Sequence, residues 1–265
     1  MTARPAIRTA LLAVAAIGAV ALSGCSGTPA AEETASPAPE ERELQVFAAA
    51  SLTETFTALA DDFEAENPGV TVQLNFDGSS GLATQIVEGA PAGVFAAANT
   101  STMDSVVAEG LTAADPVLFV RNVLEIAVPA GNPAGITSFA DLADPDVTLV
   151  VCAVEVPCGA ATQKVEESTG VELTPVSEEN AVTDVLGKVT AGEADAGLVY
   201  ATDVLGAGDS VEGIPFDEAQ DALNDYPIAP LTGADDPELA QDFVDFVLGE
   251  HAQEELTAAG FLPAE

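Results

Sequence analysis

The chain has 265 residues, and its 44 acidic against 6 basic residues give a formal net charge of -38 at pH 7. Such an excess of negative charge argues against nucleic acids and against electrostatic binding to anionic lipids, because both would be repelled. Hydrophobic residues still make up 48% of the chain, which is too many for a disordered acidic tail and enough for one or two packed cores.

The N-terminus has the pattern of an export signal. Two arginines precede an apolar stretch, Ala10 to Leu22, that is too short for a membrane-spanning helix of about 20 residues. The stretch closes with Leu-Ser-Gly-Cys at Cys25, which resembles the bacterial lipobox and implies cleavage before Cys25 and acylation of its sulfur. The alternative is an ordinary signal peptide with an incidental cysteine. We assign residues 1–24 to a lipoprotein signal peptide and residues 25–43, rich in Ala, Pro, Glu and Thr, to a flexible tether.

Two further cysteines remain, Cys152 and Cys158. In an exported protein, two thiols six positions apart are expected to form a disulfide across a short loop. The alternative is a pair of free, buried thiols. A metal site is disfavoured because there is no second cysteine pair and His251 is the only histidine in the sequence.

From Leu44 onward, strand patterns alternate with helix patterns. We expect strands in residues 44–49, 70–76, 94–98, 123–128, 147–151 and 197–200. We expect helices in residues 52–66, around 82–88, in 158–168 and 180–191, and after Asp236-Pro237. Such alternation requires crossover connections and predicts an α/β protein whose sheets are mostly parallel and flanked by helices.

About 220 residues in two such units indicate two lobes with a cleft between them. We assign residues 44–121 to lobe I, residues 122–226 to lobe II, and residues 227–265 to a return into lobe I.

Catalytic motifs are absent from the sequence, which contains no nucleophile elbow, Walker loop, dinucleotide-binding turn or HExxH pair. An exported hydrolase would have to use His251, which lies among glutamates in a polar segment that favours a solvated helix face. Acidic residues are so abundant that no carboxylate pair stands out. The sequence therefore does not predict an enzyme.

Neutral hydrogen-bond donors recur at the starts of predicted helices, at Ser51, Ser79 and Cys158. Helix N-termini present unpaired N–H groups and a positive dipole end, so several of them facing one cleft would bind an anion without any cation. The alternative is a capping role, since Ser51 with Glu54 also forms a capping-box pattern.

Several segments along the chain resemble the molybdate-binding proteins of bacterial ABC importers. They are VFAAASLT at 46–53, FDGSSGLATQ at 76–85, EGAPA at 88–92, VPAGNP at 128–133, VPCG at 156–159, GLVYATD at 197–203 and YPI at 226–228. The resemblance runs from Leu44 to Leu262. It implies a two-lobed periplasmic-binding fold of the type II, Venus-flytrap kind, which captures molybdate or tungstate between its lobes. The family delivers the anion to a membrane permease driven by a cytoplasmic ATPase.

The same resemblance implies a ligand set made of neutral donors. These are the hydroxyls of Ser51, Ser79 and Tyr200 and the backbone N–H groups of Ser51, Cys158 and Val182. Ser80 is the alternative to Ser79, and Tyr200 could instead form a hydrogen bond within its own lobe. None of these donors titrates between pH 6 and 8, so binding is expected to be independent of pH in that range.

No cofactor and no cation held by protein ligands is expected, because the metal lies within the oxyanion. The protein is expected to be a monomer, held to the outer face of the membrane only by its lipid. Sulfate, thiosulfate or phosphate would use the same class of donors. Gly93 and Asn99 stand where the family has aspartate, which affects packing at the lobe edge rather than the ligand set.

Overall fold

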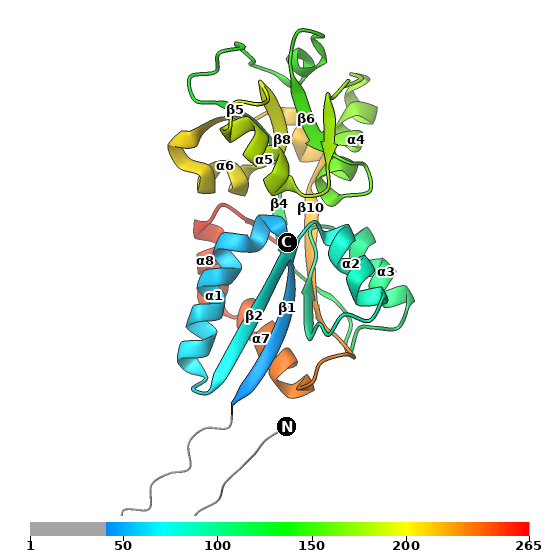
Figure 1. Ribbon diagram of the computed structural model, residues 1–265, viewed down its shortest axis with the longest axis vertical. Helices are drawn as coiled ribbons and strands as arrows, with labels where there is room; N and C mark the ends of the chain where they lie inside the picture. The colour runs from blue at the N-terminus through cyan, green and yellow to red at the C-terminus, as the bar shows by residue number, and fades with distance from the viewer. Residues whose placement is uncertain (1–40, 265) are drawn as a thin grey trace, which may run out of the picture. The chain divides into compact units, whose positions relative to one another are not determined.

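The computed structural model describes residues 41–264, which belong to one compact unit (Figure 1). The predicted signal peptide, Cys25 and most of the predicted tether lie outside the described residues. Strand β1 (Arg42–Ala49) starts inside the last residues assigned to the tether. Among residues 41–264, no helix combines the length and the apolar character needed to cross a membrane.

The first sheet has six strands in the order β11-β4-β10-β3-β1-β2. Its other strands are β2 (Val70–Asp77), β3 (Val94–Ala96), β4 (Val117–Asn122), β10 (Asn224–Pro230) and β11 (Leu262–Pro263). Its helices are η1 (Ala50–Leu52), α1 (Thr53–Glu66), α2 (Ser79–Val87), α3 (Thr100–Ala108), α7 (Pro237–Leu248) and α8 (Glu250–Ala258). Along the chain, β1, α1, β2, α2 and β3 alternate as the sequence predicted.

Helices cover both faces of this sheet because successive side chains of β1 point to opposite faces. Val46 packs with α1, α7 and α8, whereas Phe47 packs with α2 and α3. On the first of these faces, the rings of Phe63 and Phe243 meet edge to face with centroids 5.2 Å apart. This lobe is therefore a three-layer α/β unit with one hydrophobic core on each face of its sheet.

The second sheet has five strands in the order β7-β6-β8-β5-β9. They are β5 (Leu124–Pro129), β6 (Leu149–Cys152), β7 (Ser177–Glu179), β8 (Ala196–Tyr200) and β9 (Val211–Ile214). Its helices are α4 (Pro157–Thr169), α5 (Val182–Thr190) and α6 (Ala201–Ala207), with short 3-10 helices η2 (Phe139–Ala143), η3 (Gly208–Ser210) and η4 (Asp217–Ala222). One core cluster, which includes Ile126, Val165, Val185 and Leu198, unites these elements.

Both sheets are mixed, which corrects the prediction that they are mostly parallel. β1 is parallel to β2 and β3, but β10 is antiparallel to β3 and β4, and β5 is antiparallel to β8 and β9. The cause is the path of the chain between the sheets, which leaves the first sheet along β4 and returns along β10 (Figure 1). β10 begins at Asn224, whereas the sequence analysis placed the return at residue 227.

Candidate anion-binding site

A small cavity lies where helices from both sheets begin. It is lined by Ala49, Ala50, Ser51, Gly78, Ser79, Ala98, Val156, Pro157, Cys158, Val182 and Tyr200. All of the ligand residues expected from the sequence are among these, although they come from both sheets. The cavity is small: its volume of about 10 Å³ leaves room for one small group and not for a sugar or an amino acid.

The helices that begin at this cavity have no capping side chain. The residues before α2, α4 and α5 are Gly78, Val156 and Ala181, whose side chains cannot accept a hydrogen bond. Elsewhere, Asn99 caps α3 and Asp236 caps α7 through side-chain oxygens. The first amides of a helix have no acceptor within it, so α2, α4 and α5 leave N–H donors and positive dipole ends at the cavity.

Ser51 does not act as the cap that the capping-box pattern suggested. No side chain caps α1, and the Ser51 hydroxyl lies 2.8 Å from the Tyr226 hydroxyl. Burial raises the pKa of Tyr226, so this phenol stays protonated and can donate to Ser51. Ser51 then keeps its own proton for a ligand. The sequence analysis quoted Tyr226 within a family motif but gave it no role.

Ser79 and Ser80 have different surroundings. The buried Ser79 hydroxyl accepts a hydrogen bond from the Ala98 N–H at 3.0 Å and can still donate its own proton into the cavity. The Ser80 hydroxyl donates instead to the Glu155 carbonyl at 2.5 Å and does not line the cavity. Of the two serines, Ser79 is therefore the one whose hydroxyl is available to a bound anion.

Tyr200 carries a buried hydroxyl that makes no hydrogen bond of standard geometry among residues 41–264, although the side chains of Tyr226 and Asn224 lie near enough to influence its pKa. The side chain is 1% exposed, and this burial raises the pKa of the phenol well above its ordinary value. A buried donor without a partner costs about 1 to 3 kcal/mol, a penalty that a ligand oxygen would remove.

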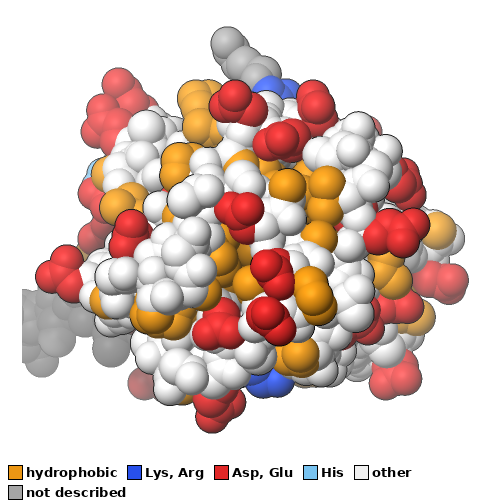
Figure 2. Space-filling view, turned by 90° about the horizontal axis from the view of Figure 1, so that it is seen from above, with side chains coloured by type: hydrophobic (Ala, Val, Ile, Leu, Met, Phe, Trp, Pro, Cys, Tyr) orange, Lys and Arg blue, Asp and Glu red, His pale blue; other side chains and the backbone are white. Residues whose placement is uncertain are grey.

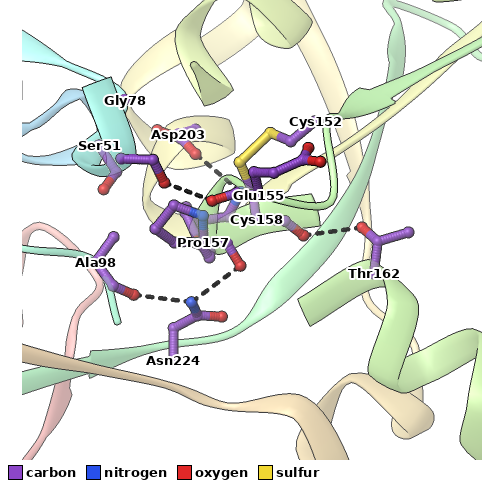
Figure 3. Close-up of a disulfide and its surroundings, with 12 residues drawn as sticks. Ser51, Gly78, Ala98, Cys152, Glu155, Pro157, Cys158, Thr162, Asp203 and Asn224 are labelled. Atoms are coloured by element: carbon purple, nitrogen blue, oxygen red, sulfur yellow. Dashed lines mark hydrogen bonds between the residues drawn. A yellow bond between two sulfur atoms is a disulfide. The ribbon is translucent and has the colours of Figure 1, made fainter. Parts of the chain in front are cut away.

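A disulfide and an asparagine fix the start of α4 (Figure 3). Cys152 at the end of β6 is bonded to Cys158 in the first turn of α4. The Asn224 amide donates to the Ala98 carbonyl at 2.8 Å and to the Pro157 carbonyl at 3.3 Å. Because Ala98 follows β3 and Pro157 opens α4, Asn224 ties the two sheets together beside the cavity. The sequence analysis did not identify Asn224.

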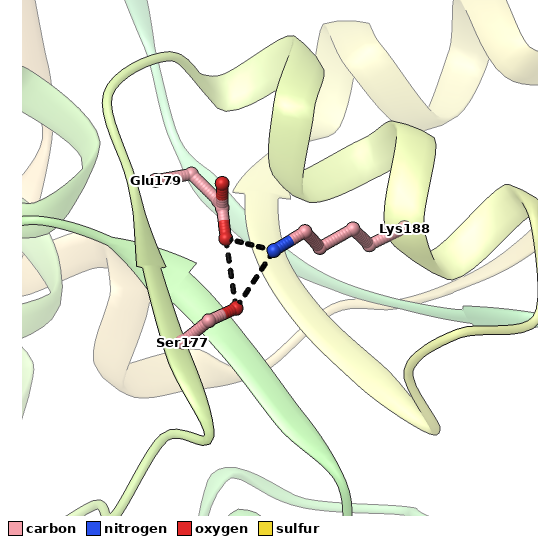
Figure 4. A network of polar contacts seen from close by, with 3 residues as sticks. All are labelled: Ser177, Glu179 and Lys188. Atoms are coloured by element: carbon pink, nitrogen blue, oxygen red, sulfur yellow. Dashed lines mark hydrogen bonds and ion pairs between the residues drawn. The ribbon is translucent and has the colours of Figure 1, made fainter.

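No charged side chain lines the cavity among the described residues. Arg42 pairs with Asp236 and Arg121 with Asp225, each at 2.7 Å. Lys188 contacts Glu179 and donates to Ser177 at 2.9 Å, which fastens α5 to the edge strand β7 (Figure 4). The hydrogen bond from Lys188 lowers the pKa of Glu179. The positive field in the cavity therefore comes from amides and helix dipoles.

Residues considered for other chemistry lie away from this cavity. His251 is exposed, with Nε2 3.0 Å from Asp62 Oδ2, and this hydrogen bond raises the pKa of the imidazole. Within residues 41–264, no group of three or more His, Cys, Asp and Glu side chains is placed to hold a metal ion.

Asp203 is the acidic residue that the sequence analysis missed. It is the third residue of α6, is 8% exposed, and accepts a hydrogen bond from the Tyr200 N–H at 2.8 Å. Burial raises the pKa of Asp203 to about 7, and the negative charge of Glu54 contributes in the same direction. The only sequence signal was its position at the end of the GLVYATD motif.

Two α/β lobes that enclose a small, uncharged, donor-lined cavity are the arrangement of a solute-binding protein. Residues 44–262 match the family model described as bacterial extracellular solute-binding protein, and the chain belongs to that family. This membership, together with the relatives below, confirms the resemblance seen in the sequence and the prediction that the chain is not an enzyme.

The chain is similar to the molybdate-binding protein ModA of Mycobacterium tuberculosis, with 46% identity over 94% of this chain and 95% of that protein. Its structure is similar to that of the periplasmic molybdate-binding protein of Azotobacter vinelandii. The TM-score is 0.73 and the identity 20%, over 84% of this chain and 100% of that one. The sulfate-binding protein SubI of M. tuberculosis has the same TM-score of 0.73 at 16% identity, over 85% and 88% of the two chains. At these identities, the two structures show the fold alone.

Gly78 provides a test of the contact between the lobes. A Cβ atom at Gly78 would lie 1.9 Å from the Asn180 carbonyl oxygen, which precedes α5 in the other lobe. We expect Gly78→Ala to hold the lobes apart and to weaken anion binding in this cavity at least tenfold, about 1.4 kcal/mol. Calorimetry would measure the affinity, and small-angle scattering would show a larger radius of gyration.

The matched control is Gly81→Ala in α2, where a Cβ atom would lie 3.4 Å from Asp77 Oδ2, an ordinary contact. This variant should bind like the parent. Parent-like affinity and dimensions in Gly78→Ala would contradict the assigned contact.

Proposed function

We propose that the protein captures molybdate, and its analogue tungstate, in the cavity between its lobes and presents the anion to the permease of an ABC importer. The observation that carries this proposal is the convergence of the expected neutral donors on one small, uncharged cavity. The 46% identity to a protein named for molybdate binding supports the choice of anion. In this proposal, lobe I consists of residues 44–121 and of the C-terminal part of the chain that begins with β10, and lobe II consists of the residues between them.

The ligand set of this proposal is Ser51, Ser79, Cys158, Val182 and Tyr200. Three hydroxyls and the amides at helix starts would surround a tetrahedral dianion. Each hydrogen bond to a charged oxygen contributes about 1.5 to 3 kcal/mol, so several donors account for tight binding without a cation. The buried Tyr200 hydroxyl supports this assignment because a ligand oxygen would supply a hydrogen bond of standard geometry that the protein does not provide.

Sulfate is the second candidate anion, because the sulfate-binding protein SubI matches this fold with the same TM-score as the molybdate-binding protein of A. vinelandii. Phosphate is disfavoured, since its proton would need an acceptor and no carboxylate lines the cavity in the described residues. Isothermal titration calorimetry against molybdate, tungstate, sulfate and phosphate distinguishes these anions. Binding of molybdate and tungstate well above sulfate supports the proposal, and failure to bind any of them contradicts it.

The hydroxyl donors give a direct mutational test. Ser79→Ala and Tyr200→Phe should each weaken molybdate binding by roughly tenfold to a hundredfold, the loss of one charge-assisted bond. Tyr200→Phe should not lower the free energy of unfolding, because the hydroxyl it removes has no partner in the protein. Calorimetry and urea unfolding measure the two effects.

Thr84→Ala is the control, since the Thr84 hydroxyl donates to the Ser80 carbonyl within α2 and does not line the anion cavity. It should retain the parent's affinity. If Ser79→Ala and Tyr200→Phe bind like the parent but melt several degrees lower, their roles are structural rather than ligand-binding.

The net charge makes a prediction about kinetics. Acidic side chains are spread over the face seen in Figure 2, where basic ones are few, and the whole chain carries a formal charge of -38. A dianion is therefore repelled at long range and attracted only within the cavity. Raising ionic strength from about 0.01 to 0.15 M shortens the screening length from about 30 to 8 Å, so the association rate should rise. Stopped-flow measurements that show a falling association rate would instead indicate a cation near the cavity.

We further propose that the mature protein is a monomer anchored by a lipid on Cys25 to the outer face of the cell membrane. The lipobox-like sequence that ends at Cys25 supports this, and residues 26–43 would then act as the tether. Replacing Cys25 by Ser should move the protein from the membrane fraction to the soluble fraction. If the Cys25→Ser variant remained in the membrane fraction, that result would contradict the lipid-anchor proposal.

A further inference from the structure

Asp203 is joined to the anion cavity through Tyr200. Its Oδ2 accepts the backbone N–H of Tyr200 at 2.8 Å, at the junction between β8 and α6. The side chain of the same tyrosine lines the cavity. The Asp203 carboxyl therefore holds in place the residue that carries the unpartnered hydroxyl.

A second, larger cavity lies on the other side of Ser51. It measures about 490 Å³ and is lined in part by Glu54, Thr202 and Asp203, and it shares Ala50 and Ser51 with the anion cavity. Glu54 extends from α1 toward α6, since a Cβ atom on Gly206 would lie 2.9 Å from Glu54 Oε2. Carboxylates from both lobes thus line one cavity together with Ser51, a proposed ligand residue.

Only the Tyr200 N–H, whose hydrogen bond lowers the pKa of Asp203, partly compensates the charge of this buried carboxylate. Asp203 is influenced by Glu54 on α1, and it in turn influences Tyr200 on β8 and Tyr226 on β10. The elements packed against α6 add Glu125 on β5, Asp209 on η3 and Glu212 on β9. None of these groups is a cation. An ionised Asp203 is therefore opposed both by burial and by its neighbours.

We propose that Asp203 is a proton-coupled positioning residue of the anion site, which holds Tyr200 by its backbone and takes up one proton from solvent when a dianion binds. The inference rests on the proposed function. A bound dianion adds negative charge next to a buried carboxylate and favours its protonated form. The hydrogen bond to Tyr200 survives, because one carboxyl oxygen carries the proton while the other accepts the Tyr200 N–H.

The direction of the pH effect follows from linkage. Without ligand, burial places the pKa of Asp203 at about 7, and a bound dianion raises that pKa further. Below pH 7, the carboxyl is protonated with or without ligand, so affinity is independent of pH. Above pH 7, binding must draw a proton, so the dissociation constant rises by up to tenfold per pH unit and levels off above the pKa of the bound state. This replaces the sequence-based expectation of a flat profile.

The test is calorimetric titration of the full-length protein with sodium molybdate from pH 6 to 9, in pairs of buffers with different ionisation enthalpies. We expect uptake of up to one proton above pH 7 and a matching loss of affinity. Asp203→Asn keeps an acceptor for the Tyr200 N–H, so it should bind as tightly as the protonated parent at every pH and take up no proton. Glu54→Gln removes a negative charge that raises the pKa of Asp203. The loss of affinity should therefore begin at a lower pH in this variant.

His251→Ala is the matched control, because it removes the one histidine in the sequence, whose exposed side chain pairs with Asp62 away from the anion cavity. It should keep the parent's profile. A parent affinity that does not change from pH 6 to 9, or a pH dependence that persists in Asp203→Asn, overturns the inference and leaves molybdate binding in place. If Asp203→Asn does not fold, the Glu54→Gln variant decides: a loss of affinity that begins at the same pH as in the parent also overturns the inference. Absence of molybdate binding at every pH would instead refute the proposed function itself, and this inference with it.

Discussion

The structure depends on hydrogen-bond donors that the protein itself leaves unsatisfied. α2, α4 and α5 begin beside one cavity with Gly78, Val156 and Ala181 in the positions where a capping side chain would stand. Each helix therefore offers free amides and a positive dipole end to whatever occupies that space. A protein with 44 acidic residues can in this way present a local site for an anion while its surface repels anions.

The rest of the fold serves to bring these helix starts together. The strand path along β4 and back along β10 places helices of two separate sheets around one cavity. Asn224 bridges carbonyls next to β3 and α4, and the disulfide between Cys152 and Cys158 holds the first turn of α4 to the end of β6. The bare backbone at Gly78 lets α2 approach Asn180 in the other lobe. These contacts explain why the cavity admits a small ion and little else.

Periodicity predicted much of the fold, because each buried strand and amphipathic helix leaves a local pattern. The helix after Asp236-Pro237 is an example, since Asp236 does cap α7 through its side chain. The antiparallel pairing of β10 with β3 and β4 could not be predicted, because it depends on where the chain crosses between sheets. The resemblance supplied the residues that line the cavity. It did not supply Asn224, Tyr226 or Asp203, whose roles arise from burial and from partners distant in sequence.

The central claim is that neutral donors alone hold the anion. The most direct measurement is a crystal structure of the molybdate complex, with the metal located by its anomalous scattering. One peak is expected in the cavity, with the oxygens of the anion within hydrogen-bond distance of the Ser51, Ser79 and Tyr200 hydroxyls and of the Cys158 and Val182 amides. A peak outside this cavity, or one contacted by Arg121, Lys164 or Lys188, would contradict it.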